Sequence, residues 1–441
     1  MAHPDAARRK APAIPLLAFV VAMLVAACGP VTPSTPPSAS GAPTTSAAPT
    51  AAPSGSGAAP SSSDDAALDA IYDAVEQQVI AIRGLQPKRP VERQFIDEAQ
   101  LRTMLTQQFD DETPTAYLAA NERFYKALAL IPATSSLRTL SLDLLSGGVV
   151  GFYRNDQGKL YVVSKTGTPG VNERFTFAHE YDHALQDQYS TIFTDQHGIL
   201  DQSDRILARQ AIYEGDATLV MTQWAAANLG QAELLELLKA ASDPAAQAVL
   251  ARTPAIMRET LTFPYTTGLG YVSAVKSAGG WPAVTAYFTA MPPSTEQILH
   301  PEKYTAGEAP VAVTFPADLA ARLGAGWTVP LLDTFGEFQT GIWLRESGVV
   351  AADATKAATG WGGDRLAVTE GPKGAWAVVI QTEWDTTTDA TEFEKAATTA
   401  LKQAVGVARV LPGVGGKAHW IVVAGDAATL ARVASALGLA G

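Results

Sequence analysis

The sequence contains little of several residue types, and each shortage excludes a class of site. Its 441 residues include one cysteine, Cys28, and only six histidines. One cysteine cannot form an intramolecular disulfide bond, and it cannot build a cysteine-ligated zinc site. Any bound metal ion must therefore be held by His, Asp or Glu.

Basic residues are also scarce relative to acidic ones. The chain has 32 Lys and Arg against 44 Asp and Glu, so its formal net charge is -12. Contacts from Lys and Arg to phosphates supply most of the affinity for nucleic acid, so we expect no nucleic-acid partner. The chain is 47% hydrophobic, which is a globular composition, and its length leaves room for two domains.

The N-terminus has the pattern of a targeting segment. Basic residues at 8–10 precede an uncharged apolar run, 11–27, which ends in small residues directly before Cys28. This is the layout of a secretory signal peptide, and a cysteine at this position resembles a bacterial lipobox. The resemblance implies that residues 1–27 are removed and that lipid on Cys28 anchors the protein, outside the cytoplasm, to the bacterial cell membrane. The alternative is a buried structural cysteine in an ordinary signal anchor.

The next segment, 28–63, is rich in Pro, Ser, Thr and Ala and has no charged or aromatic residue. It cannot bury a core, so we expect a disordered tether with a reach of about 100 Å when extended.

Two folded domains are expected after this tether. Helical periodicity dominates residues 64–308, with one β-hairpin pattern at 147–164 around the turn sequence RNDQG. From 309–441 strand and helix patterns alternate, beginning with a predicted strand at 311–316. The sequence therefore predicts an α+β fold: a mainly helical domain with a small β-sheet, followed by a small α+β C-terminal module.

The helical segment after the hairpin carries the motif HEYDH. His179 and His183 are four residues apart, so both imidazoles lie on one face of a helix and can bind one ion. Glu180 is rotated from that face by about 100° and is near enough to act on a water molecule without ligating the metal. The alternative interpretation is a solvated or buried helix face that happens to carry two histidines.

A third metal ligand has to come from elsewhere in the chain. A third histidine six residues after His183 is excluded, because that position is Tyr189. The remaining common arrangement uses a glutamate from a later helix. Glu214 lies 31 residues after His183 in a mostly apolar helical segment, where an unpaired carboxylate is costly. We expect Glu214 to be this ligand; the alternative is an exposed acid or a partner of Arg209.

Together, His179-Glu180-x-x-His183 and Glu214 in an EGxA setting resemble the gluzincin metallopeptidases. The longer strings HEYDHALQDQY, YEGDA and PPSTEQILHPEKY are similar to a group of bacterial lipoproteins assigned as metallopeptidases. The resemblance covers roughly residues 150–305. It implies a zincin-like domain that binds Zn²⁺, with Glu180 as general base. It also implies an edge strand that binds the substrate backbone, here KLYVVS or GGVVGFY.

The sequence departs from this family after Glu214. The spacing from His183 is longer than usual, and the position four residues on, often an Asp that orients a histidine, is Thr218. Asp216 and Asp187 remain as alternatives for the carboxylate that orients a ligand.

Gluzincins also use a Tyr or His to stabilise the developing oxyanion. The resemblance favours Tyr271 for this role and leaves Tyr265 and His300 as further candidates. Each of these side chains can instead serve packing or a local helix cap.

The sequence thus predicts a membrane-tethered zinc metallopeptidase that acts on peptide or protein substrates. The alternative is a lipoprotein that uses the same fold to bind peptide or cell-envelope ligands without catalysis. Hydrolysis of a non-peptide amide is a third interpretation.

Overall fold

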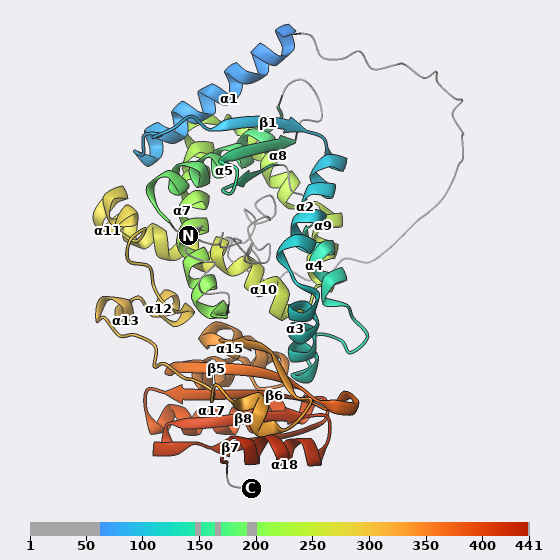
Figure 1. The fold of residues 1–441 in the computed structure, drawn as a ribbon. Helices are drawn as coiled ribbons and strands as arrows, with labels where there is room; N and C mark the ends of the chain where they lie inside the picture. The colour runs from blue at the N-terminus through green and yellow to red at the C-terminus, as the bar shows by residue number, and fades with distance from the viewer. Residues whose placement is uncertain (1–61, 146–150, 164–168, 192–200, 440–441) are drawn as a thin grey trace, which may run out of the picture.

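The computed structural model describes residues 62–145, 151–163, 169–191 and 201–439. A mainly helical N-terminal region lies above a C-terminal region built on a second sheet (Figure 1). The fold class predicted from the sequence is therefore confirmed. Cys28, the predicted signal peptide and nearly all of the predicted tether lie outside the described residues.

Helices form most of the N-terminal region. In the part of the chain that the structure describes up to residue 305, the helices are α1 (Ser62–Arg83), α2 (Glu98–Glu112), α3 (Thr115–Ala127), α4 (Leu137–Leu145), α5 (Val171–Tyr189), α7 (Ser203–Asn228), α8 (Gln231–Ala241), α9 (Pro244–Arg252), α10 (Ala255–Phe263), the π-helix η2 (Pro264–Gly268), α11 (Leu269–Ala286), α12 (Thr295–Leu299) and α13 (Pro301–Thr305). None of the described helices combines the length and apolar character needed to cross a membrane.

A three-stranded sheet is formed by segments that precede α5 in the chain. Its strands are β1 (Glu92–Ile96), β2 (Gly151–Arg154) and β3 (Lys159–Val163), in the order β1-β3-β2. β2 and β3 form the predicted antiparallel hairpin, and β1 pairs in parallel with β3. Because β3, the strand of the KLYVVS segment, is central, only β2 of the two expected segments lies at an edge.

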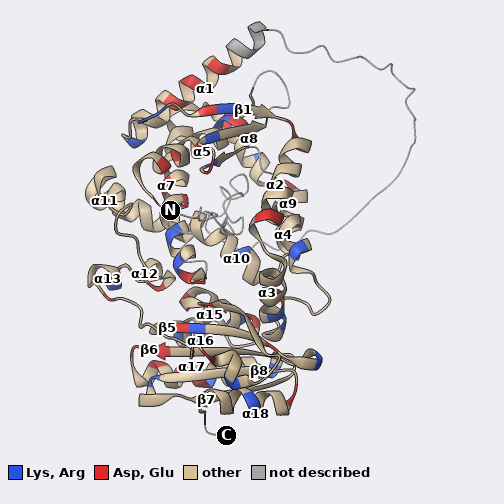
Figure 2. Ribbon diagram, viewed as in Figure 1, with Lys and Arg blue, Asp and Glu red and all other residues tan. Residues whose placement is uncertain are grey.

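Charge pairs hold α1 against this sheet. Acidic residues recur along α1 (Figure 2), and β1 contains one basic residue, Arg93. Arg93 of β1 contacts Asp69, Asp73 and Glu76 of α1 at 3.2, 2.7 and 2.9 Å. These acidic side chains are spaced at one helical turn, so one guanidinium can reach all three.

α5 and α7 occupy the centre of the N-terminal region. α5 packs against α1, α7 and β2, and most of its residues are buried. A helix that is covered on nearly all sides has little amphipathic character, and its polar side chains must find partners inside the protein. The polar residues of α5 are therefore expected to form a connected site.

The C-terminal sheet has the strand order β4-β5-β6-β8-β7 and is antiparallel throughout. Its strands are β4 (Thr328–Asp333), β5 (Trp361–Glu370), β6 (Trp376–Trp384), β7 (Val407–Pro412) and β8 (Ala418–Ala424). The helices of this region are α14 (Leu319–Leu323), α15 (Gly336–Glu346), α16 (Ala351–Ala358), α17 (Thr387–Ala400) and α18 (Ala427–Ala436), with 3₁₀ turns η3 (Pro372–Gly374), η4 (Leu401–Gln403) and η5 (Val414–Gly416).

Helices cover both faces of this sheet. Val378 and Ile380 of β6 belong to the apolar cluster that includes α15, α16 and α17. Ala377 and Val379 belong to the cluster formed with α14 and α18. Successive side chains of a strand point to opposite faces, so a run of apolar residues such as AVVI is what a strand covered on both faces requires.

Three details of the C-terminal region differ from the sequence prediction: β4, at the edge of the sheet, was not predicted, and the other two concern residues 311–316 and β7. Residues 311–316 were predicted as a strand, but they form an irregular segment that contacts β5 through one bond, from Val311 N–H to the Gly362 carbonyl (2.6 Å). Pro310 and Pro316 bracket this segment, and proline has no N–H for a strand ladder. β7 was not predicted, because this edge strand is largely exposed and lacks a continuous apolar run.

The C-terminal region contacts the first turn of α7. The carboxylate of Asp333, at the end of β4, accepts hydrogen bonds from the Ser203 N–H (2.7 Å) and the Ser203 hydroxyl (2.6 Å). The first N–H groups of a helix have no partner within the helix, so this carboxylate caps α7 from another region.

A buried ion pair joins α1 to α7. The Arg83 guanidinium donates to both oxygens of Asp216 at 2.9–3.1 Å, and both side chains have an exposed fraction of 0%. Arg83 also lies 4.6 Å from the ring centroid of Trp281 and donates to the Thr285 hydroxyl (3.0 Å). The charge is therefore fully paired where water cannot reach it.

Replacing Arg83 by Ala should destabilise the protein by about 3–5 kcal/mol, because it leaves the Asp216 carboxylate buried without its partner. Arg138→Ala is the matched control, since Arg138 pairs with Asp110 at the surface and should lose less than about 1 kcal/mol. Denaturant unfolding of the two variants measures the difference. Equal losses would contradict the structural role of Arg83.

Candidate metal centre

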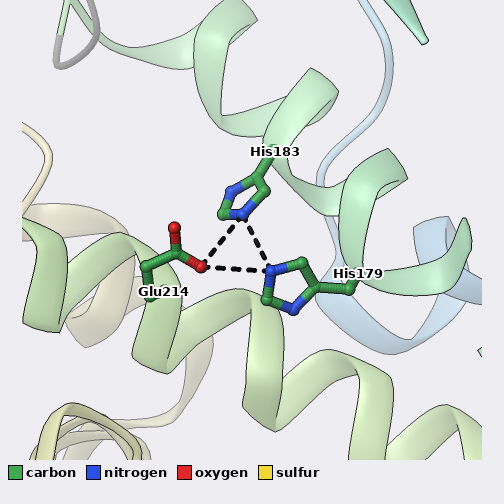
Figure 3. A group of neighbouring side chains, drawn as sticks. All are labelled: His179, His183 and Glu214. Carbon is green, nitrogen blue, oxygen red and sulfur yellow. Dashed lines mark hydrogen bonds and ion pairs between the residues drawn. The ribbon is translucent and has the colours of Figure 1, made fainter. Parts of the chain in front are cut away.

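Three predicted ligands meet in the core between α5 and α7. His179 and His183 lie one turn apart on α5, and Glu214 reaches them from α7 (Figure 3). The Nε2 atoms of the two histidines are 2.9 Å apart. Oε2 of Glu214 lies 3.1 Å from Nε2 of His179 and 3.3 Å from Nε2 of His183. Each of the three residues is at most 5% exposed.

The distances between these three atoms can be compared with those between ligand atoms around one metal ion. Nitrogen and oxygen ligands lie about 2.0–2.2 Å from Zn²⁺ in a tetrahedral site, so neighbouring ligand atoms are about 3.3–3.6 Å apart. The observed separations of 2.9–3.3 Å are slightly shorter, so a small outward shift of the side chains would give that geometry. The group formed by His179, His183 and Glu214 can therefore hold a metal ion.

The hydrogen bonds of Gln186 define the tautomer of His183. The Gln186 amide nitrogen donates to Asp182 Oδ2 and to the Tyr213 carbonyl, both at 2.9 Å. Its amide oxygen therefore faces Nδ1 of His183, 2.9 Å away, and accepts a proton from it. In the neutral ring Nε2 then carries the lone pair, which points toward His179 and Glu214 as a metal ligand should.

The charges of this group depend on one another. Burial lowers the pKa of His183, but the adjacent negative charge of Glu214 outweighs it and raises the pKa to about 10. Burial and the charge of His183 lower the pKa of His179 to about 4. Burial raises the pKa of Glu214, yet His183 and His179 hold it at about 2. In the metal-free protein one proton on His183 thus balances the carboxylate.

Glu180 lies beside the group without belonging to it. Its side chain is 2% exposed, and its Oε2 accepts a hydrogen bond from the Tyr153 N–H of β2 (2.9 Å). Burial raises the pKa of Glu180 to about 8, although the charge of His183 acts in the opposite direction. A carboxylate with a pKa near neutrality is suited to accept and return a proton during a reaction.

The sequence offered Asp216 and Asp187 as carboxylates that could orient a metal-binding histidine. Among the described hydrogen bonds, neither of them contacts a histidine. Asp216 pairs with Arg83, and Asp187 accepts from the Tyr153 hydroxyl (2.8 Å) and from Arg89 (2.6 Å). The partner of His183 is Gln186, which sequence reasoning missed. Its position three residues after His183, on the same helical face, was the available indication.

The three candidates for oxyanion stabilisation lie in different surroundings. The Tyr271 hydroxyl contacts the Tyr287 hydroxyl (3.1 Å), and Nε2 of His300 contacts Glu337 (2.8 Å). The Tyr265 ring centroid, in contrast, lies 6.2 Å from that of His179. Burial and the charges of Glu214 and Glu180 raise the pKa of Tyr265 well above its usual value. Of the three, the structure brings Tyr265 to the metal group.

Three polar atoms at this point are buried without a hydrogen-bond partner. They are the Tyr265 hydroxyl, Oε1 of Glu214 and Nδ1 of His179. Buried polar atoms are nearly always bonded, so three such atoms in and beside the group of converging ligand atoms fit a site that binds something further.

Close backbone contact brings η2 against α7. A Cβ atom on Gly215 would lie 2.5 Å from the carbonyl of Gly268, and one on Gly268 would lie 2.3 Å from the carbonyl of Ala211. Only glycine fits at both positions. The glycine directly after Glu214 thus allows Tyr265, on the π-helical turn, to approach the metal group.

In a second acidic cluster among the described residues, a lysine side chain supplies the positive charge. Glu296, Glu308 and Asp385 lie close enough together to hold a metal ion. The Lys303 ammonium donates to Glu296 (2.5 Å) and Asp385 and contacts Glu308 (2.9 Å). We therefore interpret this cluster as a structural ion-pair network.

Comparisons with known proteins cover the two regions unequally. Residues 297–437 match a family model described as a domain of unknown function (DUF8575), which contains none of the residues of the metal group. No curated protein matches the chain. One matching solved structure is described as "a putative hydrolase with a novel fold" from Chloroflexus aurantiacus, with 16% sequence identity and a TM-score of 0.37. The match covers 56% of this chain and 90% of that chain.

The affinity for Zn²⁺ should rise about tenfold per pH unit between about pH 5 and 8. Over this range His179 is already neutral and Glu214 already ionised, so the ion has to displace one proton, from His183. Competition with a chelator at several pH values measures the slope, and calorimetry in two buffers counts the released protons. A pH-independent affinity would contradict the raised pKa of His183.

Proposed function

We propose that the protein is a zinc-dependent metallopeptidase in which His179, His183 and Glu214 hold the ion. One observation carries this proposal. Two imidazole nitrogens and one carboxylate oxygen converge to within 3.3 Å in the core, and the carboxylate of Glu180 lies on the same helix beside them. A pair of histidines and a glutamate is a donor set that leaves one position of a tetrahedral zinc ion open for reaction.

The chemistry divides between the ion and the protein's own side chains. A bound zinc ion supplies Lewis acidity, which lowers the pKa of water toward 7 and polarises a carbonyl group. Glu180 accepts the proton of the attacking water and returns it to the leaving amine, a role that suits its raised pKa. The Tyr265 hydroxyl donates to the oxyanion that develops, replacing Tyr271, which the sequence favoured.

β2 is suited to hold an extended substrate. It lies at the edge of its sheet, and the Tyr153 N–H points away from β3 toward Glu180. Because backbone direction alternates along a strand, the N–H and carbonyl of Gly151 face the same side as those of Tyr153. A peptide laid along β2 would bond to Gly151 and pass Glu180.

The location in the cell is proposed from the sequence. The lipobox-like end of the segment 11–27 supports lipid attachment at Cys28, and the tether 28–63 supports a folded body held away from the membrane. The substrates would then be peptides or proteins outside the cytoplasm.

Metal content and turnover together test this function. The purified mature chain should bind one zinc ion, and Glu214→Ala should lose it. Glu180→Gln should keep zinc but lower the cleavage of a peptide library by about 10²–10⁴-fold. Glu173→Gln, a half-buried glutamate in the first turn of the same helix, is the matched control and should retain turnover.

The outcomes separate the main proposal from its rival. No zinc in the pure wild type would overturn the metallopeptidase. Zinc without turnover, and with equal peptide binding by wild type and Glu180→Gln, would favour a binding lipoprotein instead.

Tyr265→Phe should lower kcat by about 10²-fold while zinc content stays unchanged, because the variant loses a donor to the oxyanion. Tyr271→Phe should lose much less, since the Tyr271 hydroxyl is bonded to Tyr287. Steady-state kinetics on one peptide measure both variants. A larger loss for Tyr271→Phe would restore the assignment that the sequence favoured.

A further inference from the structure

A cavity of about 190 Å³ lies between the helices α2, α3, α4, α7 and α10 and the strand β4. Its walls are mostly apolar and include Phe109, Leu118, Leu144, Leu207, Ile256 and Met257. An apolar cavity of about 150 Å³ is enough to bind a benzene molecule, so this one has room for a side chain the size of Leu or Phe.

The cavity lies on the face of α7 that carries the metal ligand. Ser203, Ile206, Leu207 and Gln210 all line it. These positions and Glu214 follow the spacing 0, 3, 4, 7 and 11, which keeps them on one side of a helix. Gln210 lies one turn before Glu214, or about 6 Å along the axis. The end of the cavity at Gln210 therefore lies about one helical turn from Glu214, and the cavity continues from there toward the start of α7.

A second element links the cavity to the site. Thr260 and Leu261 of α10 line the cavity, and Tyr265 follows one turn later on η2. Two segments thus connect the metal group with the cavity wall: α7, and α10 with the η2 turn that follows it.

The polar groups of the cavity favour a neutral ligand. Asp333 is the single charged residue among the described residues that line it. Its oxygens already accept from Ser203 and from the Thr334 N–H (2.8 Å). The Thr113 hydroxyl is the opposite case: the residue is 6% exposed, lines the cavity and has no hydrogen-bond partner. A charged side chain would find no free counter-charge here, and its desolvation would be uncompensated.

We infer that this cavity is the specificity pocket of the site and takes a leucine- or phenylalanine-sized apolar side chain of the peptide substrate. The inference rests on the proposed function. It also gives the C-terminal region a part in recognition, because Thr334, Gln339 and Leu366 form one wall. Filling the cavity removes the apolar side chain from water, which stabilises the bound peptide without any charge contact.

Binding can be tested without catalysis. The mature chain, labelled with ¹³C at the methionine methyl groups, is titrated with N-acetyl-phenylalaninamide, N-acetyl-leucinamide, N-acetyl-glycinamide and N-acetyl-lysinamide. The Met257 methyl resonance, identified with Met257→Leu, should shift saturably with the first two and stay unchanged with the last two. No shift with the apolar probes, or equal shifts with all four, would overturn the inference.

A variant that fills the cavity provides the second arm. Ser141 of α4 lines the cavity, whereas Thr139 on the same helix is exposed. Ser141→Phe should abolish the Met257 shift and lower kcat/KM for peptides with Leu or Phe by about tenfold or more relative to alanine peptides. Thr139→Phe should change neither, and both variants should keep their zinc.

The two arms distinguish this inference from the proposed function. If the chain binds no zinc and cleaves nothing, the proposed function fails, while the Met257 titration still decides whether the cavity takes an apolar side chain. If peptides are cleaved with no preference that Ser141→Phe alters, the metallopeptidase stands and the specificity pocket is refuted.

Discussion

Three electron-pair donors forced together inside a protein core are the constraint on which the rest of this structure depends. His179, His183 and Glu214 cannot separate, because α5 and α7 pack tightly against each other. They also cannot stay together without a positive charge between them. A proton on His183 supplies that charge in the metal-free protein, and a metal ion can replace it. The burial that makes the group costly is therefore also what suits it to hold a cation.

Neighbouring acidic side chains in this core have separate partners. Glu214 and Asp216 are two residues apart on α7 and point to different partners, the histidines and Arg83. Gln186 lies between these two centres: it bonds to His183 on one side and to Asp182 on the other. A neutral amide in this position orients the histidine without adding a negative charge to a core that already holds several.

The sequence predicted what depends on local spacing. The pair His179 and His183 follows from the helical period, and Glu214 follows from the cost of a carboxylate on an apolar helix. Gln186 escaped prediction because an amide partner has no distinctive pattern. Tyr265 was only an alternative to Tyr271, because its position depends on a π-helical turn and on the contact of Gly215 with Gly268, and neither can be inferred from periodicity. Of the C-terminal strands, β5, β6 and β8 were found where apolar runs marked them, whereas the edge strands β4 and β7 were missed.

The capping of α7 by Asp333 has a mechanical consequence. A helix is a stiff rod, and Glu214 lies 11 residues, or about 16 Å, along it from Ser203. Because the carboxylate that holds Ser203 belongs to the C-terminal sheet, any tilt of that sheet is passed along α7 to the ligand oxygen. The two regions are therefore mechanically coupled through α7. The C-terminal region holds the start of this helix in place and so helps to set the position of Glu214 in the metal group.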